Sequence, residues 1–333
     1  MSLDDASTKP HDRLQAALSD DLASVATLIR ARMASEHAPR IPEVTAHLVE
    51  AGGKRVRPMM TLAAARACGY DGPYHVHLAA TVEFIHTATL LHDDVVDESE
   101  QRRGRPSANL LWDNQSSVLV GDYLFARSFQ LMTETGRLDV LRVLSDAAAT
   151  IAEGEVLQLT AAQDLSTSED TYLKIVRGKT AALFSAATQV GGMIADVEPR
   201  VVQAFFDYGD ALGISFQIVD DILDFGGVSA QTGKNVGDDF RERKLTLPLI
   251  KAIAAGGDKD RPFWVKTIEK GVQDEGDLET ALDLLRSHGA LEAARSDALM
   301  WSSKAKAALE EVPDDPLRDM LRDLADYVVE RIA

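Results

Sequence analysis

Apolar residues recur every three or four positions over most of this chain, and almost no segment alternates between apolar and polar residues. Between residues 74 and 97, for example, Val76, Val82, Ile85 and Leu91 follow this spacing. Such a period is typical of helices that bury one face. It continues through residues 138–162, 171–190, 200–225 and 244–255, and from residue 278 to the C-terminus. The sequence therefore predicts an all-α protein.

Clusters of Gly, Pro, Asn and Asp separate the predicted helices, and these residue types favour turns. They lie at residues 69–73, 104–106, 136–137, 191–192, 226–237, 256–257 and 313–316. No fixed-period repeat, low-complexity linker or shift in composition marks a domain boundary. We therefore predict a single all-α domain over residues 1–333, in which residues 1–12 are disordered or left over from cloning.

The balance of charge excludes several classes of partner. The chain of 333 residues has 35 Lys and Arg against 53 Asp and Glu, a formal net charge of −18 at pH 7. A field of this sign repels nucleic acids and anionic membranes. No apolar stretch reaches the roughly 20 residues that a bilayer span needs, and the N-terminus lacks a signal-peptide pattern. We expect a cytoplasmic protein that binds no nucleic acid and does not insert stably into a membrane.

The first motif with chemical content is Leu91-His92-Asp93-Asp94-Val95-Val96-Asp97. Residues three and four apart lie on one side of a helix, so Asp93, Asp94 and Asp97 are expected to share a face near the helix end. Like charges so placed repel, and the negative end of the helix dipole adds to the repulsion. Cations are therefore expected nearby, although a solvated acidic turn explains a single cluster equally well.

The same spacing returns at Asp220-Asp221-Ile222-Leu223-Asp224, again at the end of a strongly apolar helix. Two such groups are difficult to explain as solvated surface residues, and together they indicate a metal site. Carboxylate oxygens select Mg²⁺ or Ca²⁺ over Zn²⁺, and Mg²⁺ combines a few carboxylates with waters and phosphate oxygens. We therefore expect a phosphorylated substrate to complete the coordination.

Basic residues gather next to these acidic groups, although any one basic cluster is more often a solvated face. Two glycines precede three cations in Gly52-Gly53-Lys54-Arg55-Val56-Arg57, where backbone N–H groups can also face an anion. Arg102 and Arg103 follow the first acidic group. The others are Lys174, Arg177 and Lys179 on one helix, and Lys234 with residues 241–244 after the second group.

Taken together, these motifs resemble the trans-type, head-to-tail polyprenyl diphosphate synthases. The resemblance covers about residues 50–250 and extends more weakly to the C-terminus, which fits the long-chain branch (octaprenyl, solanesyl and decaprenyl diphosphate synthases). It rests on residues 53–58, 91–97, 102–104, 178–180, 216–217, 220–224, 233–234 and 244–248. It implies an isoprenoid synthase fold, a bundle of antiparallel helices around a central cavity, in a homodimer.

The resemblance also implies a role for each motif. Asp93 and Asp97 on one wall, and Asp220 and Asp224 on the other, would hold three Mg²⁺ ions on an allylic diphosphate, supported by Asp94 and Asp221. Cations expected to bind the same diphosphate are Arg102, Lys179, Lys234 and Lys244. Residues expected to bind isopentenyl diphosphate, the second substrate, are Lys54, Arg57, His86 and Arg103.

The implied reaction begins with ionisation of the allylic C–O bond, assisted by metal ions and cations. The alkene of isopentenyl diphosphate then attacks the carbocation and loses a proton to the released pyrophosphate. Thr180 and Gln217 would place oxygen dipoles near the cation, in a cavity from which water is excluded.

Product length depends on the residues below the metals. Short-chain relatives have an aromatic residue about one turn before the first aspartate, whereas this chain has the small residues Ala88 and Thr89. The growing product is therefore expected to pass this level and continue along Ile85, Val82 and Thr81, unless the small residues only allow close helix packing. We expect an octaprenyl to decaprenyl product for a quinone such as ubiquinone.

Two other classes of function stay open at this stage. A class I terpene cyclase also ionises a diphosphate with Mg²⁺, but it needs no second diphosphate site. A non-catalytic subunit of a heteromeric prenyl synthase would have the same fold, although all the metal-binding aspartates are present here.

Overall fold

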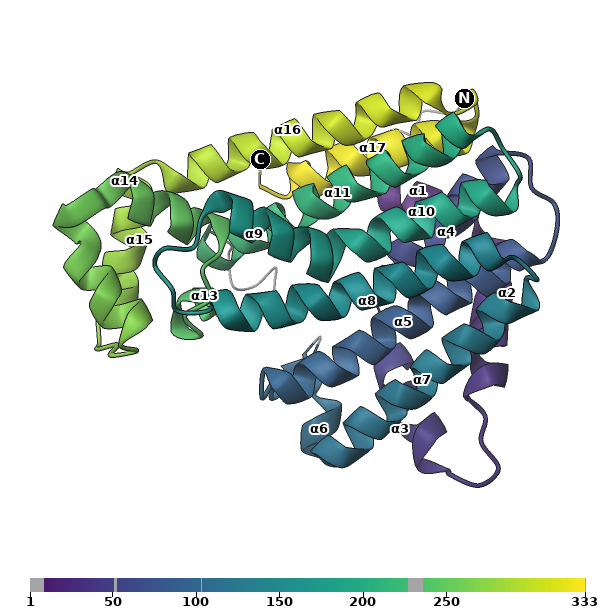
Figure 1. Ribbon diagram of the computed structural model, residues 1–333, viewed down its shortest axis with the longest axis horizontal. Helices are drawn as coiled ribbons and strands as arrows, with labels where there is room; N and C mark the ends of the chain where they lie inside the picture. Colours follow the sequence, from purple (N-terminus) through teal and green to yellow (C-terminus); the bar gives the residue numbers. More distant parts are fainter. Residues whose placement is uncertain (1–8, 51–52, 103, 227–235, 333) are drawn as a thin grey trace. The chain divides into compact units, whose positions relative to one another are not determined.

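The computed structural model describes residues 9–50, 53–102, 104–226 and 236–332 (Figure 1). Apart from one antiparallel pair of two-residue strands, the regular structure in these ranges is helical, which confirms the predicted all-α class. The chain divides into two compact units. The first comprises residues 1–148, 183–209 and 308–324, and the second residues 149–182, 210–307 and 325–333. The expected single domain over residues 1–333 stays a prediction.

The elements that begin the chain lie in the first unit. They are α1 (Pro10–Ala17), α2 (Ser19–Met33), α3 (Arg40–Glu50), α4 (Val56–Ala67), α5 (Tyr74–Val96), β1 (Gln101–Arg102), β2 (Arg105–Pro106), α6 (Ala108–Leu111) and α7 (Asn114–Glu134). Four longer helices contribute residues to both units. They are α8 (Leu138–Ala161), α10 (Ala182–Ile194), α11 (Pro199–Gly226) and α17 (Pro316–Glu330).

The second unit contains the helices around the second acidic group and most of the C-terminal part of the chain. They are α9 (Glu169–Val176), the π-helical turn η2 (Arg177–Ala181), α13 (Asp238–Arg241), α14 (Leu247–Trp264), the π-helical turn η3 (Val265–Glu269), α15 (Asp277–Ser287) and α16 (Ala290–Ala308), of which only Ala308 belongs to the first unit. A short 3-10 turn, η4 (Leu309–Glu311), belongs to the first unit.

Helix α5 is the centre of the first unit. Its side chains are buried along most of its length, among them the fully buried Phe84 and Ile85. Helix α7 runs beside it (Figure 1). Helix α7 begins where the carboxylate of Asp113 accepts a hydrogen bond from the backbone N–H of Ser116, which satisfies one of the free donors at a helix start. This packing fixes the helix that carries the first acidic group.

The core of the second unit is aromatic and aliphatic. Trp264, Phe240, Leu249 and Leu285 are buried there from the three helices α13, α14 and α15. Burying such side chains is the main source of stability in a fold of this kind. Among the described residues, no helix is both long enough and apolar enough to cross a bilayer.

Most of the predicted helices are observed, and the differences have local causes. The helix predicted from residue 244 begins at Leu247, because Pro248 favours the first turn. The predicted break at residues 191–192 lies inside α10, where a Cβ atom on Gly191 would come within 2.6 Å of the carbonyl oxygen of Thr61. That glycine serves close packing of α10 on α4. Helix α1 begins at Pro10, inside the segment expected to be disordered.

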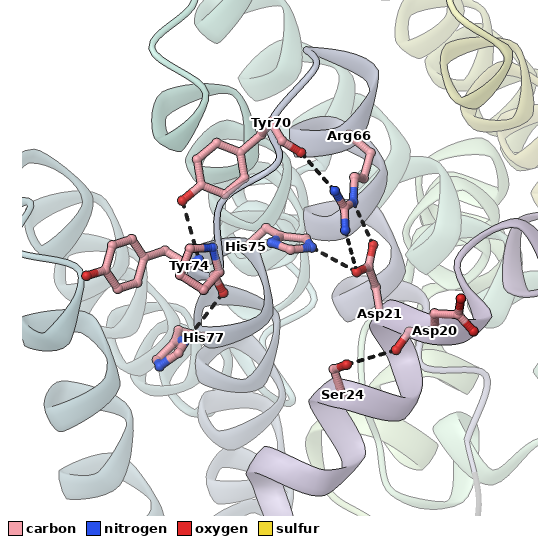
Figure 2. Close-up of polar contacts among 9 residues, drawn as sticks. Asp20, Asp21, Ser24, Arg66, Tyr70, Tyr74, His75 and His77 are labelled. Carbon is pink, nitrogen blue, oxygen red and sulfur yellow. Dashed lines mark hydrogen bonds and ion pairs between the residues drawn. The ribbon is translucent and has the colours of Figure 1, made fainter.

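A partly buried polar network joins α2, α4 and α5 (Figure 2). The guanidinium of Arg66 donates to both carboxylate oxygens of Asp21, at 2.8 and 2.7 Å, and to the carbonyl of Tyr70 at 3.1 Å. His75 Nε2 donates to the same carboxylate at 3.0 Å. The hydrogen bonds from Arg66 hold the pKa of Asp21 below its usual value, although burial opposes this effect. Asp21 therefore ties the start of α5 to two other helices.

We predict that Asp21→Asn lowers the free energy of unfolding at pH 7 by about 1 to 3 kcal/mol, because the Arg66 and His75 donors lose a charged acceptor. Since the folded pKa of Asp21 lies below the unfolded value of about 3.9, the stabilisation is complete above that pH and is lost as the pH falls through the folded pKa. Urea unfolding at pH 7 and pH 3 measures the change. The difference from wild type should shrink at pH 3.

Asp20→Asn is the matched control, because Asp20 lies in the same first turn of α2 and Arg66 and His75 both bond to Asp21 instead. It removes the same interaction with the helix dipole and leaves the network intact. Equal losses in the two variants would contradict the role given to Asp21.

Candidate active site

The first acidic group ends α5, and its three carboxylates differ in their surroundings. Asp93 is half-buried and Asp97 is exposed, whereas Asp94 is fully buried. Arg102 Nε donates to Asp94 Oδ1 at 2.9 Å, and Arg102 Nη2 donates to the same oxygen. Burial raises the pKa of Asp94, and the Arg102 hydrogen bonds oppose this. The expected shared face therefore holds for Asp93 and Asp97, but Asp94 is paired in the interior.

The second acidic group ends α11 and repeats this division. Asp220 and Asp224 are half-buried, whereas Asp221 is buried. The hydroxyl of Tyr172 donates to Asp221 Oδ2 at 2.6 Å, and Gln217 Nε2 donates to Oδ1 at 2.8 Å. Burial raises the pKa of Asp221 above its usual value, although both hydrogen bonds oppose it. Burial likewise raises the pKa of Tyr172, so that its hydroxyl stays protonated as the donor.

In each group, the outer two carboxylates, Asp93 with Asp97 and Asp220 with Asp224, lie one helical turn apart. Their oxygens are hard ligands, which suit Mg²⁺ or Ca²⁺. Within the described ranges, no three acidic, histidine or cysteine side chains converge closely enough to hold a metal ion alone. The donor set fits a divalent ion that takes its remaining ligands from water or substrate oxygens.

Two predicted residues lie in η2, where the helix widens into a π turn. Such turns are rare and are often found at functional sites. A Cβ atom on Gly178 would lie 2.7 Å from the Cα of Gly154, so this turn approaches α8 through glycine on both sides. Lys179 Nζ consequently lies 2.9 Å from Glu155 Oε2. Thr180 Oγ1 donates to Gln217 Oε1 at 2.8 Å.

These contacts form one continuous chain of hydrogen bonds in the second unit. Thr180 donates to Gln217, Gln217 donates to Asp221, and Tyr172 donates to the other oxygen of Asp221. The chain connects the π turn with the helix that carries the second acidic group. The position of Thr180 is therefore linked to that of Asp221.

The basic motif before α4 forms a second arrangement, in the first unit. Lys54 is exposed, and Arg55 adopts left-handed dihedrals (φ 46°, ψ 37°) at the start of the helix. This conformation costs a non-glycine residue about 1 to 2 kcal/mol. Arg57 Nη1 lies 3.3 Å from His86 Nε2, and its guanidinium lies 4.4 Å from the centre of the Phe184 ring. The structure thus brings Arg57 and His86 together.

The remaining predicted residues are placed as follows. Ile85 and Ala88 are fully buried in α5, and Thr89 is half-buried and donates to the carbonyl of His86 at 2.8 Å. Lys244 Nζ lies 2.7 Å from Glu242 Oε2. Arg103 and Lys234 lie outside the described residues.

Sequence reasoning missed Glu155 and Tyr172. Glu155 is one acidic residue among many, and only the glycine pair Gly154 and Gly178 hinted at a close approach there. Tyr172 lies seven residues before Lys179, but the sequence pattern of an aromatic residue at an apolar position indicates a core residue. Neither residue carries a signal that spacing alone can detect.

Comparison with known proteins identifies the family. The polyprenyl synthetase profile matches residues 38–285. The chain is 44% identical over 320 residues to octaprenyl diphosphate synthase of Escherichia coli, covering 96% of this chain and 98% of the relative. It is 70% identical to a decaprenyl diphosphate synthase from Rhodobacter capsulatus of known structure, with a TM-score of 0.94 and coverage of 97% and 99%.

A third relative bears on the ligands. A polyprenyl synthase from Caulobacter crescentus, solved with calcium and isoprenyl diphosphate, is 50% identical, with a TM-score of 0.92 and coverage of 97% of this chain and 98% of that one. The chain belongs to the polyprenyl synthetase family. It is a long-chain polyprenyl diphosphate synthase, a prenyltransferase with the isoprenoid synthase fold. Members of this family act on prenyl diphosphates and use divalent metal ions.

We predict that Tyr172→Phe raises the Mg²⁺ concentration for half-maximal activity by about three- to tenfold, because Asp221 loses one of its two donors and the helix end that carries Asp220 and Asp224 is less well held. The Michaelis constant for isopentenyl diphosphate should stay unchanged. Metal titrations of initial rate, and of the melting temperature in the presence of pyrophosphate, measure the effect.

Tyr208→Phe is the control, because Tyr208 is fully buried in α11 and donates to the carbonyl of Leu321 at 2.8 Å. It loses a buried hydroxyl without touching an aspartate. If both variants show the same Mg²⁺ dependence, Tyr172 has only a general role in packing.

Proposed function

We propose that this enzyme condenses isopentenyl diphosphate repeatedly with an allylic diphosphate, such as farnesyl or geranylgeranyl diphosphate, and releases an all-trans product of octaprenyl to decaprenyl length. The observation that carries the proposal is the paired outer carboxylates in both acidic groups, each held by a buried and hydrogen-bonded middle aspartate. The similarity to octaprenyl and decaprenyl diphosphate synthases supports the product range. Such a chain suits the tail of a quinone such as ubiquinone.

Asp93, Asp97, Asp220 and Asp224 are the proposed ligands of three Mg²⁺ ions. When bound, Mg²⁺ supplies Lewis-acid stabilisation of the negative charge that develops on the leaving diphosphate. The four carboxylates would hold the ions, and through them would orient the diphosphate. Asp94 and Asp221 keep the helix ends in place, because Arg102 donates to Asp94 Oδ1, and Tyr172 and Gln217 donate to the two oxygens of Asp221.

The cations divide between the two substrates. Lys179 and Arg102 bind the allylic diphosphate, with Lys244 assisting. Lys179 and Lys244 each lie within hydrogen-bond distance of a carboxylate in this structure, so substrate binding exchanges that carboxylate for a phosphate oxygen, whereas Arg102 keeps its bond to Asp94. Lys54, Arg57 and His86 bind isopentenyl diphosphate. Two further cations lie outside the described residues. Lys234 is assigned to the allylic diphosphate, and Arg103 to isopentenyl diphosphate.

The chain's remaining task is to protect the carbocation. Thr180 and Gln217, joined at 2.8 Å, direct oxygen dipoles that favour positive charge. An apolar cavity excludes water, which would trap the cation as an alcohol. The proton lost from isopentenyl diphosphate passes to the released pyrophosphate, so that no carboxylate serves as base.

A homodimer is part of the proposal. Helices α6 and α7 expose a run of large apolar side chains, between 39% and 66% exposed, at Leu110, Leu111, Val118, Leu119 and Phe129. Scattered exposed apolar residues are common, but five on two consecutive helices favour a protein contact. A second copy of the chain is the proposed occupant. The cytoplasmic location expected from the sequence stays a prediction.

The direct test incubates the purified chain with Mg²⁺, isopentenyl diphosphate and farnesyl diphosphate, and separates the dephosphorylated products by chromatography against length standards. We expect linear products of octaprenyl to decaprenyl length. A cyclic hydrocarbon would indicate a terpene cyclase, and no product would indicate a non-catalytic subunit. Either result would overturn the proposed reaction.

Ala88→Phe tests the course of the growing chain. Ala88 lies five residues before Asp93, about 7 to 8 Å along the helix axis, so a phenyl ring there is expected to block elongation and shorten the main product. Ala88→Ser keeps a small side chain and should leave product length unchanged. The same chromatography measures both, and the melting temperature checks that the larger residue is accommodated. An unchanged distribution in Ala88→Phe removes this residue from the channel wall.

A further inference from the structure

His11 links the N-terminal segment, which carries none of the sequence motifs, to the loop that carries Lys54. It lies in the first turn of α1 and is only 8% exposed. Its Nε2 is 2.7 Å from the carbonyl oxygen of Lys54, 43 residues away in sequence. A carbonyl oxygen only accepts, so the imidazole N–H donates this hydrogen bond.

Helix α1 is held by contacts that do not involve this loop. Leu14 is fully buried, and Arg13 Nη1 donates to Asp323 Oδ2 of α17 at 3.0 Å. The imidazole of His11 is therefore fixed from its own helix. The hydrogen bond therefore ties the loop to a helix that has contacts of its own.

The carbonyl group that His11 holds belongs to the peptide plane between Lys54 and Arg55. The orientation of that plane is set by ψ of Lys54 and φ of Arg55, and φ of Arg55 is 46°. Left-handed dihedrals at a non-glycine residue persist only where the surroundings enforce them. The Arg55 side chain makes no capping hydrogen bond that would do so. The bond from His11 is a constraint from outside the loop.

We propose that His11 is a positioning residue for the isopentenyl diphosphate site. Its hydrogen bond holds the Lys54–Arg55 turn in the conformation that presents the Lys54 ammonium and starts α4, whose first turn carries Arg57. Without the bond, the turn relaxes toward ordinary dihedrals, and the direction of the Lys54 side chain changes with it. This inference rests on the proposed role of Lys54 and Arg57.

The test compares two amides of different length at the same position. His11→Gln places an N–H near the position of Nε2 and retains the bond, whereas His11→Asn is one methylene shorter and does not reach the carbonyl. We expect His11→Asn to raise the Michaelis constant for isopentenyl diphosphate about tenfold, the effect of losing one hydrogen bond. His11→Gln should stay within about threefold of wild type. The Michaelis constant for farnesyl diphosphate should not change in either variant.

Arg13→Gln is the control for docking of α1, because it weakens the contact with Asp323 and leaves His11 in place. It should not alter the Michaelis constant for isopentenyl diphosphate. A tenfold rise in this control, or an equal rise for both substrates in His11→Asn, would show that general helix docking is responsible and would overturn the proposal. So would equal constants in His11→Asn and wild type.

The failure of the inference is distinguishable from failure of the proposed function. If the wild-type chain forms no polyprenyl product from isopentenyl diphosphate, the proposed function is wrong. If it does, and His11→Asn keeps the wild-type constants, only the role of His11 is wrong. Melting temperatures of all four proteins establish that each is folded under the assay conditions.

Discussion

A carboxylate removed from water destabilises a fold by several kcal/mol unless protein donors replace its lost hydration. Each acidic group of this enzyme contains one such carboxylate, and in each group it is the middle one. Arg102 donates two hydrogen bonds to Oδ1 of Asp94, and Tyr172 and Gln217 each donate to one oxygen of Asp221. Because a buried group has few alternative partners, these bonds fix the rotation of the helix ends. The positions of the outer aspartates therefore depend on the bonds made by the middle ones.

Two cations of the proposed site are likewise held by nearby carboxylates. With a net charge of −18, this chain offers many carboxylates, and Lys179 and Lys244 are each within 3 Å of one, at Glu155 and Glu242. A diphosphate carries more negative charge than a carboxylate and accepts more hydrogen bonds, so it can displace these partners. The carboxylates keep the lysine side chains ordered before the substrate binds, so that these side chains lose less conformational entropy on binding.

Most of the fold follows from the sequence because helical periodicity is a local signal, and α5 and α8 match their predicted extents to within one residue. The two acidic groups can also be predicted from the sequence, since spacing on a helix determines which side chains lie close together. The burial of their members cannot be predicted in this way, because it depends on neighbours that are distant in sequence. The sequence therefore grouped Asp94 with Asp93 and Asp97, although the pairing with Arg102 sets it apart. The roles of Tyr172, Glu155 and His11 cannot be predicted from the sequence pattern for the same reason, because each depends on one long-range contact.

The π turn at Arg177–Ala181 has a consequence for how related chains can diverge. A turn of this kind holds one residue more than an α-helical turn, so side chains before and after it are out of register with a regular helix. Deleting any single residue there would restore regular winding and rotate Tyr172 by about 100° about the helix axis. The hydroxyl would then leave Asp221 although both acidic groups were intact. A relative can therefore share all the aspartates and still lack the bond that holds Asp221, if its chain differs in length across this segment.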